Sequence, residues 1–491
     1  MISKTASRDV LTLLSGSFIA KLIAMASITI FARALSKQEM AVFPAYFMLT
    51  GLSCLVLTLG IFSLFTRDIP SLLQRGEIEQ MRSLAVTGSA VIILGTIPVI
   101  LFSLYFGDAI AGLVFRDVDD GWIIKLMAPG FLAATISQIA EYMMWGRGQF
   151  GATSLVQMLQ SFLRPIGTLT FYFWLGFPGV VVGLVVAEFI SAGAGIWCIR
   201  DVVIGPLPAI YPLRRLVSES MPYYIGNYLT YFRGDGDSLF VTALLGPQAL
   251  AEYYIAKILY TNAFLLMTAV DKVAVQRLAR FIGTPAFLDT VRNLHVQISE
   301  VLIPFSLLLI ALAPGLMTVI GGSRYANATW PAIVLLVAML IQFIGVSYNR
   351  AIYVALPGTT RLKFTAIETL VVVVSTCVLA PLAGIIGAAF SRVIAALGIW
   401  LFGAFLLRRH LAAALPLRPT FIAVATGLPG TILVLLLSAP ATGLRGAIIL
   451  LLQSGTIWTA AFLGLTLVLN RPLIESLSGA FTRRYRAAFS S

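Results

Sequence analysis

The sequence predicts an all-helical membrane protein that crosses the bilayer many times. Of its 491 residues, 59% are hydrophobic and only 11% are charged, and the mean hydropathy is +0.94. Apolar runs of membrane-spanning length recur along the whole chain, and the basic residues gather in alternate connections between them. A globular core of this size does not need so much apolar surface, so the composition indicates a polytopic membrane protein.

Fourteen membrane-spanning helices are expected when each apolar run of roughly 20 residues is ended at a charge cluster or at Gly, Pro or Asp. The expected spans are 9–34, 41–65, 83–106, 122–144, 153–174, 178–199, 219–245, 250–271, 293–320, 329–355, 363–380, 384–407, 419–438 and 447–470.

The first span follows Lys4 and Arg8 and is similar in this respect to a secretory signal. Its apolar run is too long for a signal, and it lacks a small-residue cleavage site. We therefore expect an uncleaved membrane helix.

Prolines occur within or near the ends of several later spans, where they are expected to bend the helices. They are Pro44, Pro129, Pro165, Pro222 and Pro314. Such bends permit large movements of a membrane transporter but do not establish them.

The tail 471–491 follows the last span and places apolar residues at near-helical spacing opposite its arginines. This pattern predicts an amphipathic helix that lies on the cytoplasmic lipid surface.

The orientation follows from the basic residues, because loops rich in Lys and Arg stay on the cytoplasmic side. Connections expected inside hold 22 of the 34 Lys and Arg residues, whereas the outer connections hold five. Both termini are therefore expected in the cytoplasm. The net charge of +13 is spread over many short segments, so it reflects topology and the anionic inner leaflet rather than nucleic-acid binding.

Catalytic, nucleotide-binding and metal-binding signals are missing from the sequence. Most connections are shorter than about 20 residues, which leaves no room for a soluble catalytic or ATPase domain, and there is no G-x-x-x-x-G-K-[ST] loop. The three cysteines lie far apart inside spans, and His295 and His410 fall near inner span ends, where we expect them to meet solvent or headgroups. We expect no enzyme activity, no metal and no cofactor.

Weak internal matches relate the first six spans to the next six. Gly195-Ile196-Trp197 recurs as Gly398-Ile399-Trp400, and the segment 34–46 resembles 243–256. An even number of spans per repeat gives a parallel repeat about an axis along the membrane normal. The predicted organisation is an N-lobe at 1–200, a C-lobe at 201–410, two additional spans at 411–470 and the cytoplasmic tail at 471–491.

The chain resembles the polysaccharide biosynthesis flippases of O-antigen and exopolysaccharide synthesis, in the multidrug/oligosaccharidyl-lipid/polysaccharide exporter superfamily. The similarity is carried by Leu13–Lys21 (LLSGSFIAK), by Phe31–Ser36 (FARALS) leading into an aromatic second span, and by Arg67-Asp68-Ile69-Pro70 with Gly76-Glu77. Span number and repeat agree over nearly the whole chain.

This resemblance implies a V-shaped pair of six-helix lobes in which the first, second, seventh and eighth spans line a central cavity. It implies transport of undecaprenyl-pyrophosphate-linked oligosaccharide from the inner to the outer leaflet of the bacterial inner membrane. The sequence leaves open whether the protein acts alone or beside glycan polymerase and co-polymerase partners. Two spans beyond twelve often add a lipid-facing groove for the polyprenyl tail in such flippases.

Charged residues inside spans are candidates for the transport site, because each costs roughly 2.5–3.5 kcal/mol to place at the centre of a bilayer. Lys21, Arg233 and Lys257 lie on spans that the resemblance sends to the cavity, with Arg350 as a fourth candidate. These bases are expected to hold the substrate pyrophosphate. The alternative is that nearby acids neutralise them and that they only join helices.

Acids inside spans are candidates for coupling to H⁺ or Na⁺. They include Asp235, Asp237 and Glu141. The Asp235-Gly236-Asp237 motif has two alternatives: a charge network with Arg233, or the metal-nucleotide motif of a glycosyltransferase, which would need a soluble fold.

Further charges inside spans favour a structural role. Arg164, followed by Pro165, is expected to form an ion pair within its lobe, and Glu188 and Arg392 occupy equivalent places in the sixth and twelfth spans.

Three rival functions remain open at this stage. They are a drug/cation antiporter of the same superfamily, with a more acidic and aromatic cavity, a lipid II flippase, and a glycan polymerase or ligase with a large outer loop.

Overall fold

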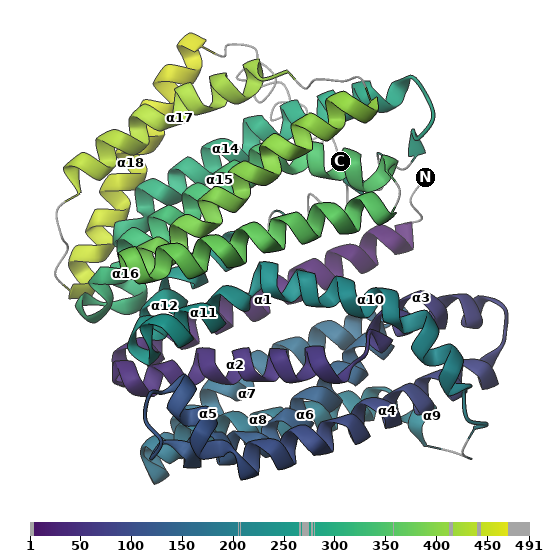
Figure 1. Ribbon diagram of the computed structural model, residues 1–491. Helices are drawn as coiled ribbons and strands as arrows, with labels where there is room; N and C mark the ends of the chain where they lie inside the picture. The colour runs from purple at the N-terminus through teal and green to yellow at the C-terminus, as the bar shows by residue number, and fades with distance from the viewer. Residues whose placement is uncertain are drawn as a thin grey trace, which may run out of the picture. The chain divides into compact units, whose positions relative to one another are not determined.

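The computed structural model is built from helices, and it describes most of the chain (Figure 1). The described residues are 4–204, 206, 208–264, 267, 274–275, 278, 280–356, 358–411, 416–438 and 443–469. They form seventeen α-helices and one short 3-10 helix, and within these ranges there is no β-strand. The predicted all-α polytopic fold is confirmed, while the predicted tail 471–491 lies outside the described residues.

The first compact unit, unit 1, comprises residues 1–254 and 376–384. Its helices are α1 (Lys4–Ala34), α2 (Lys37–Leu57), α3 (Ile61–Gln74), α4 (Ile78–Tyr105), α5 (Gly107–Val114), α6 (Gly121–Gly146), α7 (Phe150–Leu175), α8 (Phe177–Cys198), α9 (Arg200–Val203), α10 (Leu213–Gly234), α11 (Gly236–Leu245) and the first part of α12 (Pro247–Ala263).

The second compact unit, unit 2, comprises residues 255–375 and 385–491. It contains the rest of α12, then α14 (Ala286–Gly321), η1 (Ser323–Ala328), α15 (Thr329–Ala355), most of α16 (Gly358–Leu411), α17 (Arg418–Leu437) and α18 (Gly443–Leu469). The predicted division into lobes at residues 200 and 410 stays a prediction.

Every predicted span has described residues that lie on one or more of these helices. Among the described residues, nine helices are long and apolar enough to cross a membrane. The predicted spans at 9–34, 153–174, 219–245 and 250–271 fall on α1, α7, α10–α11 and α12, which are not among those nine. The eleventh and twelfth spans are both on α16, whose backbone leaves the helical conformation at Ala383 and Gly384.

Two spans are broken where the sequence shows no proline. The second span is divided into α2 and α3 after Thr58, and the backbone at Leu59 and Gly60 has φ values of 47° and 79°. The seventh span is divided into α10 and α11 at Asp235. Helices continue through all five of the predicted proline sites, and the expected bends there stay a prediction.

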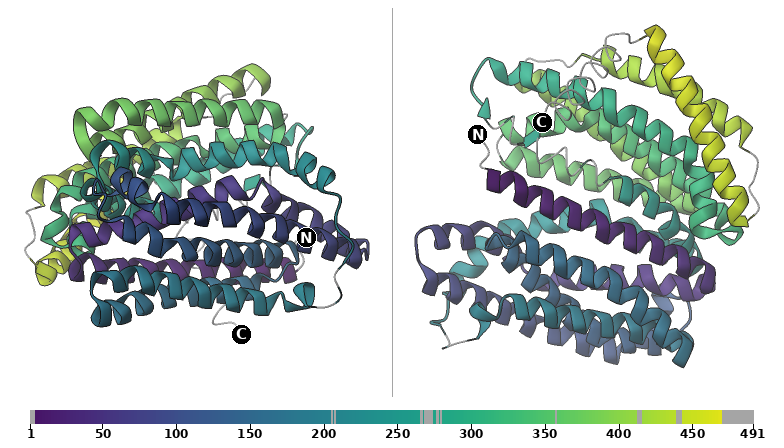
Figure 2. Two further views of the ribbon diagram at one scale, coloured as in Figure 1. Left: turned by 60° about the horizontal axis from the view of Figure 1, so that its bottom comes forward. Right: turned by 180° about the vertical axis from the view of Figure 1, so that it is seen from behind.

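Helix α6 is the centre of unit 1 and packs against α3, α4, α5 and α8 (Figures 1 and 2). Its inner face is lined by buried apolar and small residues such as Ile124, Met127 and Met144. Outward-facing positions of neighbouring helices remain apolar, with Leu101 at 59% exposure and Trp174 at 77%. Such a surface fits contact with lipid.

In unit 2, α17 and α18 pack on α14. The Trp458 indole donates to the Thr431 hydroxyl, which donates to the carbonyl of Leu307. His295 is fully buried and lies 3.1 Å from the Thr420 hydroxyl. The expectation that His295 meets solvent or headgroups is therefore wrong, because α17 covers this part of α14.

Contacts within unit 1 gather several of its connections into two groups. At one end, Arg82 contacts the carbonyls of Val202 and Pro206, and Arg147 pairs with Asp201. At the other end, Arg116 donates to the carbonyl of Leu244. We call these the basic end and the outer end; which of them faces the cytoplasm stays a prediction.

The segment that joins α9 to α10 is fastened to α4. Besides the Arg82 contacts, the Ser83 hydroxyl donates to the carbonyl of Ala209, and the backbone amide of Tyr211 donates to the Thr87 hydroxyl. The last of these contacts lies two residues before α10 begins.

Candidate functional site

A polar cavity lies inside unit 1 between α2, α6, α7 and α8. Its volume is about 370 Å³. The lining residues are Tyr46, Phe47, Thr50 and Gly51 of α2, Ala134, Ser137, Gln138, Glu141, Tyr142 and Trp145 of α6, Gln160 and Arg164 of α7, and Glu188 of α8. We call it the unit-1 cavity.

A buried ion pair forms one wall of the unit-1 cavity. The Glu188 carboxylate has no exposed surface, and it accepts hydrogen bonds from Arg164 Nε at 2.8 Å and from Gln160 Nε2 at 2.9 Å. Arg164 Nη2 lies 2.6 Å from the same carboxylate, and the guanidinium stands 4.9 Å from the centre of the Phe47 ring. The expected ion pair of Arg164 within its lobe is present, and a buried pair of this kind needs all of its hydrogen bonds to be stable.

Glu141 presents a second carboxylate to the unit-1 cavity. Its Oε1 accepts a 2.6 Å hydrogen bond from Gln157 Nε2. Unlike Glu188, Glu141 has no ion pair within the described part of the chain. It is therefore the carboxylate of this cavity that is available for a proton or a small cation.

Three further polar groups line the cavity without a suitable partner among the described residues. The Tyr46 and Thr50 hydroxyls are buried close to each other, yet neither makes a hydrogen bond of acceptable geometry. The Trp145 indole N–H is likewise buried and unpaired. Because buried polar groups are nearly always hydrogen-bonded, these groups indicate a cavity that holds water or a small polar ligand.

The four predicted pyrophosphate-binding bases are divided between the units. Lys21 on α1 and Arg233 in the last turn of α10 belong to unit 1, and both are half-buried. Lys257 on α12 and Arg350 on α15 belong to unit 2; Lys257 is 8% exposed, and Arg350 stands 5.9 Å from the Tyr353 ring. That the four bases bind one pyrophosphate stays a prediction.

The break between α10 and α11 gives Asp235 and Asp237 different surroundings. Asp235 is exposed at the junction, whereas Asp237 is fully buried in the first turn of α11. The Asp237 carboxylate accepts a 2.7 Å hydrogen bond from the Tyr253 hydroxyl and a 2.8 Å bond from the Ser238 amide. Asp237 is thus anchored, and its role in ion coupling stays a prediction.

Sequence reasoning missed the neutral residues of the unit-1 cavity. Their signal was the spacing to charges already singled out: Gln160 shares one face of α7 with Arg164, and Trp145 shares one face of α6 with Glu141. Within the described ranges, no three His, Cys, Asp or Glu side chains could hold a metal ion.

The chain is similar to one protein family and to several solved structures. The profile of the polysaccharide biosynthesis protein family matches residues 6–275, more than half of the chain. No curated protein matches the sequence significantly.

Several solved membrane transporters have a similar structure. The lipid II flippase MurJ in an inward closed conformation aligns over 94% of this chain and 100% of its own, with 13% identity and a TM-score of 0.75. An inward-facing multidrug resistance transporter of the MATE family, in the MOP superfamily, covers 80% of this chain and 96% of its own, with 15% identity and a TM-score of 0.61. A MOP superfamily transporter from Pyrococcus furiosus Vc1 covers 83% of this chain and 96% of its own, with 13% identity and a TM-score of 0.57. At such identities the similarity establishes a shared fold.

Proposed function

The chain belongs to the polysaccharide biosynthesis protein family, and we propose that it is a flippase for undecaprenyl-pyrophosphate-linked oligosaccharides. It would carry them from the inner to the outer leaflet of a bacterial inner membrane for O-antigen, capsule or exopolysaccharide synthesis. In this proposal the protein is a transporter rather than an enzyme, both termini are cytoplasmic, and a glycan polymerase and co-polymerase act beside it.

The observation that carries the proposal is the family match together with the extent of the structural similarity. The lipid II flippase structure covers 94% of this chain, whereas the two other transporters cover 80% and 83%. The difference is comparable in length to α17 and α18 together. A fold extended by two spans fits a lipid-linked substrate whose isoprenoid tail stays in the bilayer.

For substrate binding, we propose that Lys21, Arg233, Lys257 and Arg350 hold the pyrophosphate by charge-assisted hydrogen bonds. A Lys21→Ala/Arg233→Ala double variant should then insert stably but lose glycan export. Lys125→Ala is the matched control, because Lys125 is an exposed base paired with Asp108. Normal export by the double variant would contradict this assignment.

For energy coupling, we propose that Glu141 binds the coupling H⁺ or Na⁺ in the unit-1 cavity. Its support is the contrast between the two cavity carboxylates, since Glu188 is already neutralised by Arg164. Asp235 and Asp237 are the alternative coupling groups.

The decisive experiment measures the amount and leaflet side of undecaprenyl-linked oligosaccharide in cells that lack the protein and in cells that re-express it. Complete lipid-linked units should accumulate on the cytoplasmic side and be cleared by re-expression. Accumulation of the peptidoglycan precursor instead would indicate a lipid II flippase.

A drug/cation antiporter is the second candidate, and the unit-1 cavity is the observation that favours it. Two glutamates and several aromatic side chains line this cavity beside a single arginine, which is the lining expected for organic cations. Unchanged glycan pools with altered resistance to cationic compounds would support this candidate.

A further inference from the structure

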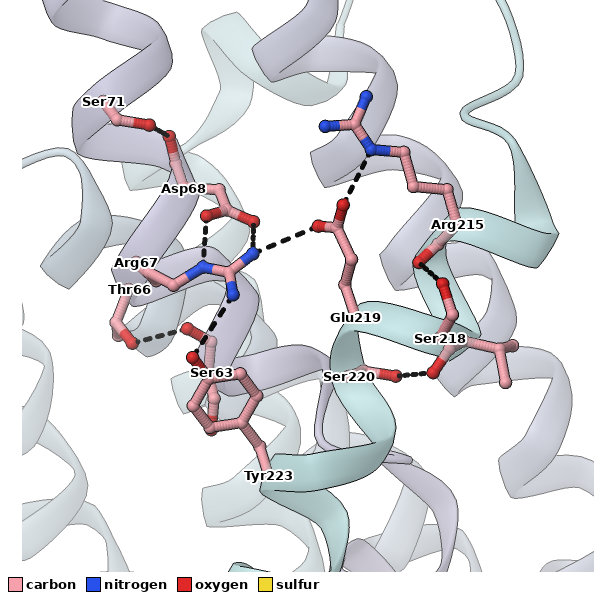
Figure 3. Close-up of polar contacts among 11 residues, drawn as sticks. Ser63, Thr66, Arg67, Asp68, Ser71, Arg215, Ser218, Glu219, Ser220 and Tyr223 are labelled. Atoms are coloured by element: carbon pink, nitrogen blue, oxygen red, sulfur yellow. Dashed lines mark hydrogen bonds and ion pairs between the residues drawn. The ribbon is translucent and has the colours of Figure 1, made fainter. Parts of the chain in front are cut away.

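A network of charges joins α3 to the start of α10 at the basic end of unit 1 (Figure 3). Arg67, on α3, makes a two-bond contact with the carboxylate of its neighbour Asp68, with Nη2 at 2.7 Å from Oδ2. The same Nη2 lies 3.1 Å from Glu219 Oε2 on α10, and Nη1 donates to the Tyr223 hydroxyl at 3.2 Å. Arg67 therefore connects two helices that are about 150 residues apart in sequence.

The network is held in a charged and half-exposed state. The hydrogen bond with Asp68 raises the pKa of Arg67 above its ordinary value, so the guanidinium stays protonated. Glu219 is shared between Arg67 and Arg215, whose Nε donates to it at 2.8 Å. The side chains of Arg67 and Glu219 are 45% and 28% exposed. Exposed pairs of this kind stabilise a contact only weakly, so this one forms and breaks easily.

Behind the charges, the contact between the second span and α10 combines backbone approaches, single hydrogen bonds and apolar packing. We call this contact the α3–α10 seam. A Cβ built on Gly60 would lie 2.4 Å from the carbonyl oxygen of Ser220, so the two backbones are in close approach. Further along, the Tyr224 and Tyr231 hydroxyls donate to the carbonyls of Val56 and Met48 on α2, at 3.4 and 3.0 Å. Leu216 of α10 is also fully buried in one apolar cluster with Phe65 and Ile69 of α3, so separation of the seam exposes this side chain as well as breaking single hydrogen bonds.

An equivalent ion pair lies at the outer end of the second span. Lys37, in the first turn of α2, pairs with Glu252 on α12, and the two side chains are 29% and 14% exposed. The second span is therefore tied by charge at each end to the segment 213–254, the beginning of the predicted C-lobe.

We propose that Arg67 and Glu219 form a releasable ionic latch that keeps the basic end of the transport path closed, with Lys37 and Glu252 as its counterpart at the outer end. The proposal rests on the proposed transport function, because alternating access requires one end to open while the other stays closed. Each pair stabilises closure of its own end, so loss of one pair should favour opening at that end alone.

The test uses two buried reporter positions in a background in which Cys54, Cys198 and Cys377 are replaced by Ala. Ser220→Cys reports the α3–α10 seam, because Ser220 is 1% exposed and lies beside Gly60. Thr242→Cys reports the outer end, because Thr242 is 2% exposed and its hydroxyl contacts the sulfur of Met48 at 3.7 Å. A membrane-impermeant maleimide is applied to inside-out and to right-side-out vesicles, and the labelling rate of each cysteine is measured.

Arg67→Ala and Glu219→Gln are each expected to raise the labelling rate of the Ser220→Cys reporter about two- to fivefold, the range for an exposed ion pair. They should leave the Thr242→Cys reporter unchanged. Lys37→Ala should raise the labelling rate of the Thr242→Cys reporter and leave that of the Ser220→Cys reporter unchanged. Lys125→Ala, which breaks an exposed pair between α5 and α6, should change the labelling rate of neither reporter.

Two results would overturn the latch. One is a labelling rate of the Ser220→Cys reporter that is the same in Arg67→Ala and Glu219→Gln as in Lys125→Ala. The other is a rise in the labelling rates of both reporters together, which would indicate general loosening of the protein. The labelling assay needs neither substrate nor transport. Its result therefore tests the latch even if the glycan assay contradicts the flippase proposal.

Discussion

Replacement of Gly60 by Ala should disturb the α3–α10 seam far more than the same replacement at Gly76. Both glycines have left-handed backbones, with φ of 79° and 73°. An alanine in this conformation costs about 1–2 kcal/mol in either place. Gly76 has no atom within 4 Å of the added Cβ, so this strain is its whole penalty.

At Gly60 the added methyl group meets backbone atoms that cannot turn aside. The Cβ would lie 2.4 Å from the Ser220 oxygen and 2.8 Å from the Tyr224 nitrogen, whereas real Cβ contacts are essentially never closer than 3.0 Å. The helices must therefore separate by at least about half an ångström. Forced overpacking of this kind costs a further 1–3 kcal/mol, roughly.

Purified Gly60→Ala and Gly76→Ala proteins should be compared by their melting temperatures in detergent and by labelling of the Ser220→Cys reporter. We expect Gly60→Ala to melt at a lower temperature than Gly76→Ala and to label faster, while Gly76→Ala labels at the wild-type rate. Equal melting temperatures with equal labelling would refute the close approach of the two backbones.

Three further predictions concern the cavity and the basic end of unit 1. Arg164→Met should lower the free energy of unfolding by about 3 kcal/mol, because it leaves the buried Glu188 carboxylate without its counter-charge. The double variant Arg164→Met/Glu188→Leu should recover most of this stability. A series of melting curves in which the double variant is the least stable would contradict this expectation. Glu141→Gln should abolish the dependence of transport on the ion gradient without lowering the melting temperature, and ionophore-sensitive transport by this variant would speak against coupling at Glu141. Asp201→Asn should reduce stability by no more than about 1 kcal/mol, because Asp201 is a 58% exposed partner of Arg147. The hydrogen bond from Arg147 lowers the pKa of Asp201 below its ordinary value, so the stability difference should be constant from about pH 5 to 8 and shrink only below the ordinary carboxyl pKa. A stability difference that changes between about pH 5 and 8 in melting curves would show the sign to be wrong.

The spans could be predicted because hydropathy and helix length are local properties of the sequence. Even the predicted end of the eleventh span at residue 380 lies close to the point where α16 leaves the helical conformation, at Ala383 and Gly384. The break after Thr58 could not be predicted in this way. Leu59, which precedes Gly60 there, has φ of 47°, a conformation that no local pattern favours for leucine.

For the site, the sequence indicated which charges are costly in a membrane but not which groups they contact. That Arg164 needs a partner within its lobe follows from the cost of burying it. Its partner Glu188 lies 24 residues away on another helix, and that choice depends on how α7 and α8 pack. The burial of His295 is a similar case, because α17, which covers it, begins more than 100 residues later.

The fastening of residues 202–211 to α4 has a mechanical consequence. This segment moves with α4 rather than acting as a flexible linker, because it is held at Val202, Pro206, Ala209 and Tyr211. Any swing of α10 must then pivot on the few bonds between Tyr211 and Leu213, two turns of helix before Glu219. Rotation of α10 at this pivot moves Glu219 away from Arg67. The proposed latch and the point about which α10 rotates therefore lie close together at the start of this helix.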